Sequence, residues 1–201
     1  DNWKPDFDID PEWKKVKIGD IAELATGGTP LSTNKNYYGG DIKWLVSGDI
    51  HKKEIYDCDG RITELALKES NAKLLPINSV LIALNGQGKT RGSVAILRTT
   101  AACNQSLISI NPDNQKMLPE FLFYVLESKY KDIRSITGDN QRSGLNMSII
   151  RSIEVPMPTI AAQKIVIEEV KKEKNLVDVV EKLININKSK IAHVVDKIWN
   201  E

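Results

Sequence analysis

The stretch VPMPTIAAQK, residues 155–164, separates two parts of the chain that differ in composition. Pro156 and Pro158 stiffen a short connector, because the proline ring fixes the backbone angle φ. Thr159 follows them and belongs to the residue types that cap the N-terminus of a helix. These signals predict that a helix begins here and that a separate domain precedes it.

Residues 160–200 contain neither glycine nor proline, which predicts one helix of about 40 residues, roughly 60 Å long. One column of a seven-residue repeat is apolar throughout this helix. A helix with a continuous apolar stripe needs a partner helix to cover the stripe. The residues expected to face this partner are Val170, Val177, Val180, Ile184, Ile191 and Ile198. The alternative is a break within residues 185–189, NINKS, after which the helix folds back on itself.

The preceding residues are rich in short β-strand patterns bounded by turns. SVLIAL at 79–84, GSVAIL at 92–97 and SLISI at 106–110 are compact runs of apolar and β-branched residues, as in buried strands. PEFLFYVLESKYKDIRSI, residues 119–136, predicts one helix that stops at Gly138. The expected class is therefore α+β: a mixed, β-rich globular domain at 1–157, followed by one long helix at 158–201 of the antiparallel coiled-coil type.

The bulk composition describes an ordinary globular protein, with 41% hydrophobic and 27% charged residues. The sequence contains no apolar run long enough for a membrane helix, so we expect no membrane partner. Cys58 and Cys103 lie far apart and have no metal-ligand spacing, which suits the reducing cytoplasm and predicts no metal site. No catalytic motif is present, and we expect neither a catalytic residue nor a bound cofactor.

Net charge gives no sign of a nucleic-acid partner. Residues 160–201 hold eight of the 28 basic and seven of the 27 acidic residues, so the rest of the chain carries 20 of each sign. A positive face would therefore require the fold to bring basic residues together on one side of the domain. The candidates are Lys52, Lys53, Lys89, Arg91, Arg98 and Arg142.

The stretch LNGQGKTRGSVA, residues 84–95, is reminiscent of a phosphate-binding loop of nucleotide hydrolases but departs from it twice. The pattern GxxxxGK[ST] requires glycine at position 83, where this chain has alanine. The element after the loop must be a helix, whereas GSVAIL is strand-like. The alternative is a glycine-rich hairpin with a polar tip that contacts DNA phosphates or base edges. Its candidate residues are Gly86, Gln87, Lys89, Thr90 and Arg91.

Two further polar clusters lie next to predicted strands or between glycines. Asn104 and Gln105 precede the strand SLISI, and TGDNQRSGLN, residues 137–146, is a predicted loop. Amide and guanidinium groups can form bidentate contacts with base edges, and they serve equally well in turns. The DNA-binding candidates in the second cluster are Asn140, Gln141, Arg142 and Ser143.

Taken in order, these pieces resemble one protein family. The stretches that carry the resemblance are PEWKKVKIGDIAELATGGTP, IKWLVSGDI, SVLIALNGQGKTRGSVAIL, CNQSLISINP and SGLNMSIIRSIEVPMPTIAAQKIVIEEV. Together they are similar to the specificity subunit of type I restriction-modification systems. The similarity runs from about Trp13 to the C-terminus, and the order of the pieces is more specific than any single one.

The resemblance implies a target recognition domain that binds one half of a split sequence in double-stranded DNA. It also implies a long conserved helix that acts as a spacer and as a dock for modification subunits. Those methyltransferase subunits carry S-adenosylmethionine and methylate adenine, while separate restriction subunits cleave DNA with ATP. The specificity subunit itself is not an enzyme.

The chain departs from this pattern in two respects. A full specificity subunit of this family has two recognition domains and two helices, whereas this chain has one of each, so it is a half-subunit, a natural single-domain version or a fragment. The natural mate of its apolar stripe is then the same helix of a second copy, packed antiparallel. The family commonly has an acidic residue where this chain has Ala162, before Gln163. Two alternatives stay open: the specificity component of a type II system that combines methylation and cleavage, and a helical adaptor that never binds DNA.

Overall fold

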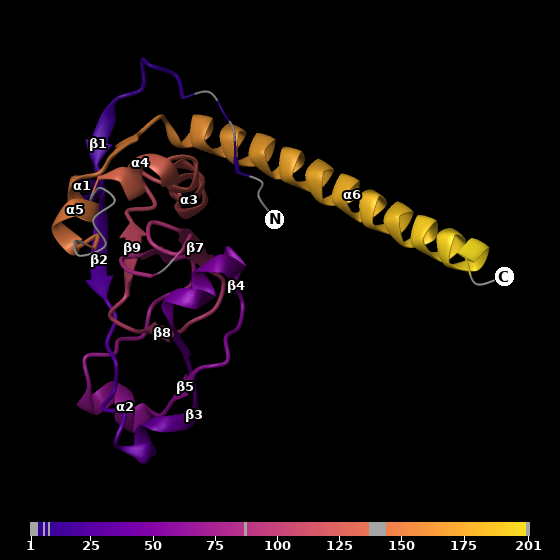
Figure 1. The fold of residues 1–201 in the computed structure, drawn as a ribbon. Coiled ribbons are helices and arrows are strands. Elements are labelled where there is room, and N and C mark those ends of the chain that lie inside the picture. The colour runs from indigo at the N-terminus through magenta and orange to yellow at the C-terminus, as the bar shows by residue number, and fades with distance from the viewer. Residues whose placement is uncertain (1–3, 6, 8, 87, 137–143, 200–201) are drawn as a thin grey trace.

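The computed structural model describes residues 4–199, apart from residues 6, 8, 87 and 137–143. A globular part holds all the strands, and helix α6 (Ile160–Trp199) projects away from it as one continuous helix of 40 residues (Figure 1). The predicted long helix is confirmed, and the alternative break within 185–189 does not occur. No helix in the described part of the chain has the length and apolar character needed to cross a membrane.

A five-stranded sheet forms the centre of the globular part. Its strand order is β2 (Ala22–Thr26), β9 (Leu107–Pro112), β6 (Val80–Ala83), β7 (Val94–Leu97) and β4 (Glu54–Ile55). Neighbouring strands are antiparallel except for β4 and β7, which are parallel. The strands predicted on either side of the glycine loop are confirmed as β6 and β7, which pair directly with each other.

The inner strands β6 and β7 are buried on both faces, which explains their uninterrupted apolar runs. Successive side chains of a strand point to opposite faces. Ile82 and Ile96 belong to the core shared with helix α3 (Pro119–Ser128). Leu81 and Leu97 belong to a second core on the other face, together with Ile50 of the 3₁₀-helix η2 (Ser47–Lys52). A strand covered on both faces has no need of alternating polar residues.

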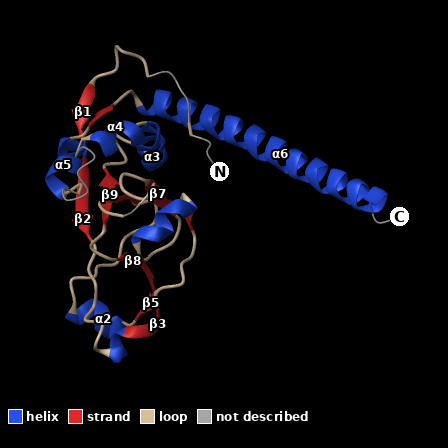
Figure 2. Ribbon diagram, in the orientation of Figure 1, coloured by secondary structure: helices blue, strands red, loops and turns tan. Residues whose placement is uncertain are grey.

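A smaller sheet lies at the end of the globular part farthest from α6 (Figure 2). Its order is β5 (Arg61–Ile62), β3 (Tyr38–Leu45) and β8 (Ala102–Cys103). The 3₁₀-helix η1 (Lys35–Tyr37) and helix α2 (Glu64–Glu69) pack beside it. Thr63 caps α2, because its hydroxyl accepts a hydrogen bond from the Ala66 amide.

The single helix predicted for residues 119–136 is wrong, because the segment forms two helices. Helix α3 ends at Ser128, and helix α4 (Tyr130–Ser135) follows it directly. Lys129 leaves the helical conformation, with φ −83° and ψ 9°. The turn brings the Tyr130 hydroxyl within 3.0 Å of the Lys89 carbonyl oxygen, to which it donates a hydrogen bond. Gly138, the predicted end, lies outside the described residues.

A two-stranded sheet and two short helices connect the globular part to α6. Strand β1 (Lys15–Lys17) pairs with β10 (Glu154–Pro156), and helices α1 (Ile18–Ile21) and α5 (Met147–Ser152) pack against each other nearby. Thr159 caps α6 as predicted, since its hydroxyl accepts from the Ala162 amide at 3.3 Å.

Gln163 fixes the start of α6 on the globular part. Its side chain is fully buried, and its Oε1 accepts a hydrogen bond from the Leu118 amide at 2.8 Å. Its Nε2 donates to the carbonyl oxygens of Lys116 and Pro158, at 2.8 and 3.0 Å. A buried amide with three good partners ties the helix to the segment that precedes α3.

Candidate nucleic-acid interface

The glycine loop between β6 and β7 is a tightly wound hairpin connection. Gly86, Gly88 and Gly92 all have positive φ angles, of 135°, 59° and 80°. Residues other than glycine rarely adopt these backbone angles, so the three glycines allow the chain to turn sharply here. A Cβ atom on Gly86 would lie 2.6 Å from the Thr90 side chain. Because a strand and not a helix follows the loop, the structure agrees with the rejection of a nucleotide-hydrolase loop.

The Asn104–Gln105 cluster lies beside the base of the glycine loop. The Leu84 amide donates to the Ser106 carbonyl oxygen at 2.9 Å. Asn104 shapes its own turn, since its side-chain oxygen accepts from the Ser106 amide at 3.0 Å. Gln105 is exposed, and its side-chain oxygen accepts a hydrogen bond from the Thr29 hydroxyl. Of the two predicted contacts, Gln105 therefore has the better access to a ligand.

The third predicted cluster, residues 137–146, is described only at its C-terminal end, and this end lies beside the base of the glycine loop. Asn140, Gln141, Arg142 and Ser143 lie outside the described residues, as does Gln87 of the glycine loop. Gly144, which follows them, approaches Asn85 so closely that a Cβ atom would collide with the Asn85 side chain. The Leu145 amide donates to the Leu84 carbonyl oxygen at 3.2 Å.

Three segments that are far apart in sequence thus meet at one end of the central sheet, where β6 ends and β9 begins. They are residues 84–86, 104–106 and 144–145. Residue patterns alone left open whether these clusters belong to one surface. The fold brings the described parts of these clusters together at one place.

The far flank of the glycine loop is fixed by two other elements. Thr90 Oγ1 lies 3.0 Å from Nε2 of His51 in η2. The Lys89 carbonyl oxygen accepts from the hydroxyls of Tyr130, at 3.0 Å, and Ser93, at 2.6 Å. These contacts tie Lys89 and Thr90 to neighbouring elements, although Lys89 itself is exposed.

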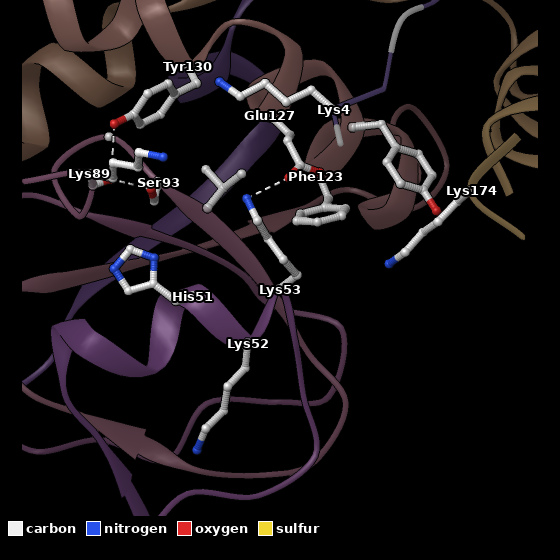
Figure 3. A pocket seen from close by; sticks show the side chains of 13 residues that line it. Lys4, His51, Lys52, Lys53, Lys89, Ser93, Phe123, Glu127, Tyr130 and Lys174 are labelled. Carbon is white, nitrogen blue, oxygen red and sulfur yellow. Dashed lines mark hydrogen bonds and ion pairs between the residues drawn. The ribbon is translucent and has the colours of Figure 1, made fainter. Parts of the chain in front are cut away.

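A cavity of about 520 Å³ opens beside this flank, and we call it the basic cavity (Figure 3). Its charged lining residues are Lys4, Lys52, Lys53, Lys89, Glu127 and Lys174, with His51 beside them. Phe123, Tyr124 and Tyr130 supply aromatic walls. Of the basic residues expected on one face, Lys52, Lys53 and Lys89 line this cavity. Lys4, Lys174 and Glu127 come from other parts of the chain, and no motif in the sequence pointed to them.

Arg98, which was expected on the same positive face, has a structural role instead. Its guanidinium donates to Glu54 at 2.7 Å and to Glu120 at 2.7 Å, and it also bonds Asn78. The pairing ties the end of β7 to α3 and uses the arginine's fork of donors. Arg91, in contrast, lies half-buried within the glycine loop.

Helix α6 divides into an inner part that is covered and an outer part that is exposed. Val170 is 1% exposed and lies in the domain core with Val166 and Ile167, so it has no surface left for a partner helix. Further along, Val177 is half-buried, while Val180, Ile184 and Ile191 are 53%, 46% and 64% exposed. The Ile198 side chain lies outside the described residues.

The exposed stripe of α6 is wider than the predicted column. Leu176 and Leu183 are 68% and 54% exposed, and their spacing places them beside Val180 and Ile184. The strict seven-residue column omitted both leucines, which a search at spacings of three and four would have found. In a single chain this outer stripe leaves a large apolar surface in water.

Comparison with known proteins identifies relatives along nearly the whole chain. Residues 11–191 match the family described as the type I restriction modification DNA specificity domain. The type I restriction enzyme MjaIX specificity subunit of Methanocaldococcus jannaschii is 31% identical over 195 residues, covering 94% of this chain and 42% of that protein. The EcoR124I/EcoR124II specificity subunit of Escherichia coli is 27% identical over 163 residues, covering 78% of this chain and 39% of that protein.

Solved structures share the fold at lower sequence identity. The HsdS subunit from Thermoanaerobacter tengcongensis has a TM-score of 0.66 and 16% identity, over 89% of this chain and 41% of that one. The S subunit of a type I restriction-modification system from M. genitalium has a TM-score of 0.60 and 17% identity, over 93% and 46%. The chain spans less than half the length of each of these relatives.

Proposed function

The chain belongs to the family of type I restriction-modification DNA specificity domains, and from this membership we propose that it recognises a DNA sequence on behalf of partner subunits. The observation that carries the proposal is the meeting of residues 84–86, 104–106 and 144–145, the described parts of the three candidate clusters, at one end of the central sheet. We propose that residues 1–157 bind one half of a bipartite target, and that residues 158–201 act as spacer and docking helix.

The glycine loop supplies the chemistry that such recognition needs. Lys89 and Arg91 can contact phosphates, which position a protein on DNA without reading its sequence. Gln87, Gln105 and the amide and guanidinium groups of residues 140–142 can read base edges in the major groove. The glycines let the backbone approach the DNA closely, since they carry no side chain.

We assign the chemistry of the complex to partner subunits. In this proposal the modification subunits methylate adenine with S-adenosylmethionine, and the restriction subunits cleave DNA with ATP. The specificity chain positions them and is not itself catalytic. It works in the cytoplasm, which suits Cys58 and Cys103, both buried as free thiols.

The near-neutral net charge of the globular part was the argument for a helical adaptor, but the folded chain weakens that argument. Lysines from separate segments gather around one cavity beside the glycine loop, although the globular part is neutral as a whole. The relatives compared above are specificity subunits of type I systems. That favours a type I partner over the type II alternative.

Binding to duplex DNA at several salt concentrations tests the proposal. Replacing Lys89 and Arg91 by alanine should weaken binding and reduce the slope of log K against log salt by about two, one for each phosphate contact. Lys35→Ala, at an exposed lysine of η1 beside the smaller sheet, is the matched control and should leave the slope unchanged. An affinity of the double variant equal to that of the unmodified chain at low and high salt would contradict the assignment.

We also propose that the outer stripe of α6 pairs with the same stripe of a second copy, packed antiparallel. The chain spans 42% of a full-length relative, so two copies supply about what one relative holds. Sedimentation of the chain, alone and with its modification subunit, tests this. A dimer that takes up the methyltransferase supports it, whereas a chain that stays monomeric and ignores the methyltransferase contradicts it.

A further inference from the structure

The basic cavity gathers positive charge from four separate segments of the chain. Lys4 comes from the N-terminal segment, Lys53 from the end of η2, Lys89 from the glycine loop and Lys174 from α6. Lys52 also lines the cavity, but its ammonium turns away to Asp49, at 2.8 Å (Figure 3). The only acidic side chain in the described lining is Glu127, so positive charge is in clear excess.

Lys53 lies at the cavity in a backbone conformation that residues other than glycine rarely adopt. Its φ and ψ angles are 63° and −58°, close to those of a strained three-residue turn. Its carbonyl oxygen accepts a hydrogen bond from the Ile96 amide at 2.7 Å, so the turn is anchored to β7. Its ammonium lies 2.5 Å from Glu127 Oε1 (Figure 3). Such strain persists where the surroundings fix it, and it is most common at functional sites.

Glu127 is the counter-charge within this cluster. It is only 4% exposed, and a carboxylate at that depth requires a charged partner, which Lys53 provides. The charge of Glu127 also acts on Lys4. Burial and the neighbouring charge of Lys53 lower the pKa of Lys4, whose ammonium lies 4.0 Å from the centre of the Tyr130 ring. An anion in the cavity would relieve this repulsion.

We propose that the basic cavity binds backbone phosphates of the DNA strand that passes the glycine loop, with Glu127 holding Lys53 in place until a phosphate replaces it. This inference rests on the proposed function and adds a site to it. Lysine suits the role because its ammonium binds phosphate as a point charge without a fixed geometry. The volume of about 520 Å³ lies within the usual range for ligand sites.

The test uses the full chain and two probes, inorganic pyrophosphate by calorimetry and random-sequence duplex DNA by fluorescence anisotropy. Lys53→Met and Lys174→Met should each lower pyrophosphate affinity by about tenfold, because each removes one charge-assisted contact. Each should reduce the salt slope of DNA binding by about one. Lys171→Met is the matched control, since Lys171 lies one turn from Lys174 but pairs with Glu168 at 3.3 Å. It should change neither value.

Glu127→Gln gives an effect of opposite sign, which a loss of folding cannot imitate. Removing the counter-charge frees Lys53 and adds one net positive charge, so pyrophosphate and DNA should both bind more tightly. Unchanged or weaker binding of both probes by a folded Glu127→Gln chain would overturn the inference.

Two other outcomes separate this inference from the proposed function. If the lysine variants bind DNA with an unchanged salt slope, the cavity is not a DNA site, while recognition through the loops still stands. If the unmodified chain binds pyrophosphate but no duplex, the cavity takes phosphate from another source. In that case both the assignment to DNA and the proposed function are overturned.

Discussion

The inner and outer parts of α6 carry apolar residues at the same helical spacing but meet different surroundings. Val166, Ile167 and Val170 are at most 7% exposed, because they pack in the core of their own domain. Ile184 and Ile191, two and three repeats beyond Val170, are 46% and 64% exposed. Spacing therefore predicts that a helix has an apolar face, but it does not reveal what covers that face. The inner part belongs to the domain, and the outer part is available to a partner.

The largest effect should come from a charge placed on the inner part. Val170→Asp buries a carboxylate without a partner and should lower the free energy of unfolding by more than about 3 kcal/mol. Ile184→Asp, on the outer part, should change it by less than about 1 kcal/mol. Urea unfolding at concentrations where the chain is monomeric measures both. Equal losses from the two substitutions would mean that the division of α6 is wrong.

A smaller loss should follow when the polar anchor of the inner part is removed. Gln163→Met keeps the volume but removes the hydrogen bonds of the Leu118 amide and of the Lys116 and Pro158 carbonyl oxygens to this side chain. An unsatisfied group costs at least about 1 kcal/mol, so at this lower limit the three groups together should cost about 3 kcal/mol. Gln115→Met, at an exposed position close by, is the control and should stay within about 0.5 kcal/mol. If both variants unfold at the same urea concentration, Gln163 does not anchor the helix.

The smallest effect concerns how the stability of the chain changes at acid pH through Glu120 of α3, the helix on which the inner part of α6 packs. Burial raises the pKa of Glu120, but the hydrogen bond and the charge of Arg98, together with a backbone hydrogen bond, outweigh it, so the pKa is below its usual value. A carboxyl with a lowered pKa in the folded state contributes stability above its unfolded pKa. That contribution is lost as the pH falls through the folded pKa.

Arg98→Met removes the cause of this lowered pKa. The melting temperature of the variant should therefore fall less than that of the unmodified chain as the pH drops below about 4.5, the ordinary pKa of glutamate. Thermal melts from neutral pH to acid compare the two chains. A steeper fall for the variant than for the unmodified chain would show that the assignment of Glu120 is incorrect.

The sequence predicted those parts of the fold that depend on local patterns. Thr159, the absence of glycine and proline after it, and the two apolar runs around the glycine loop gave α6, β6 and β7 correctly. Local patterns are sufficient here because each element is long or strongly apolar. The break at Lys129 was missed, since the residues on both sides of it favour helix.

The parts that the sequence did not predict depend on contacts between distant segments. Nothing in the residues around Lys4 and Lys174 indicates that both line one cavity with Lys53. Gln163 could be recognised in a motif, but its three buried hydrogen bonds follow from the folded chain. The polar clusters were singled out as candidates from their residue types, and the fold alone brought their described ends together.

Selection from a pool of random DNA duplexes tests the central claim most directly. The full chain, mixed with its modification subunit, is used to enrich the duplexes that it binds. If the chain reads DNA and pairs through the outer part of α6, the enriched sequences will hold two identical, inverted half-sites separated by a constant spacer. Recovery of duplexes without any shared sequence would contradict the claim that this chain is a DNA specificity module.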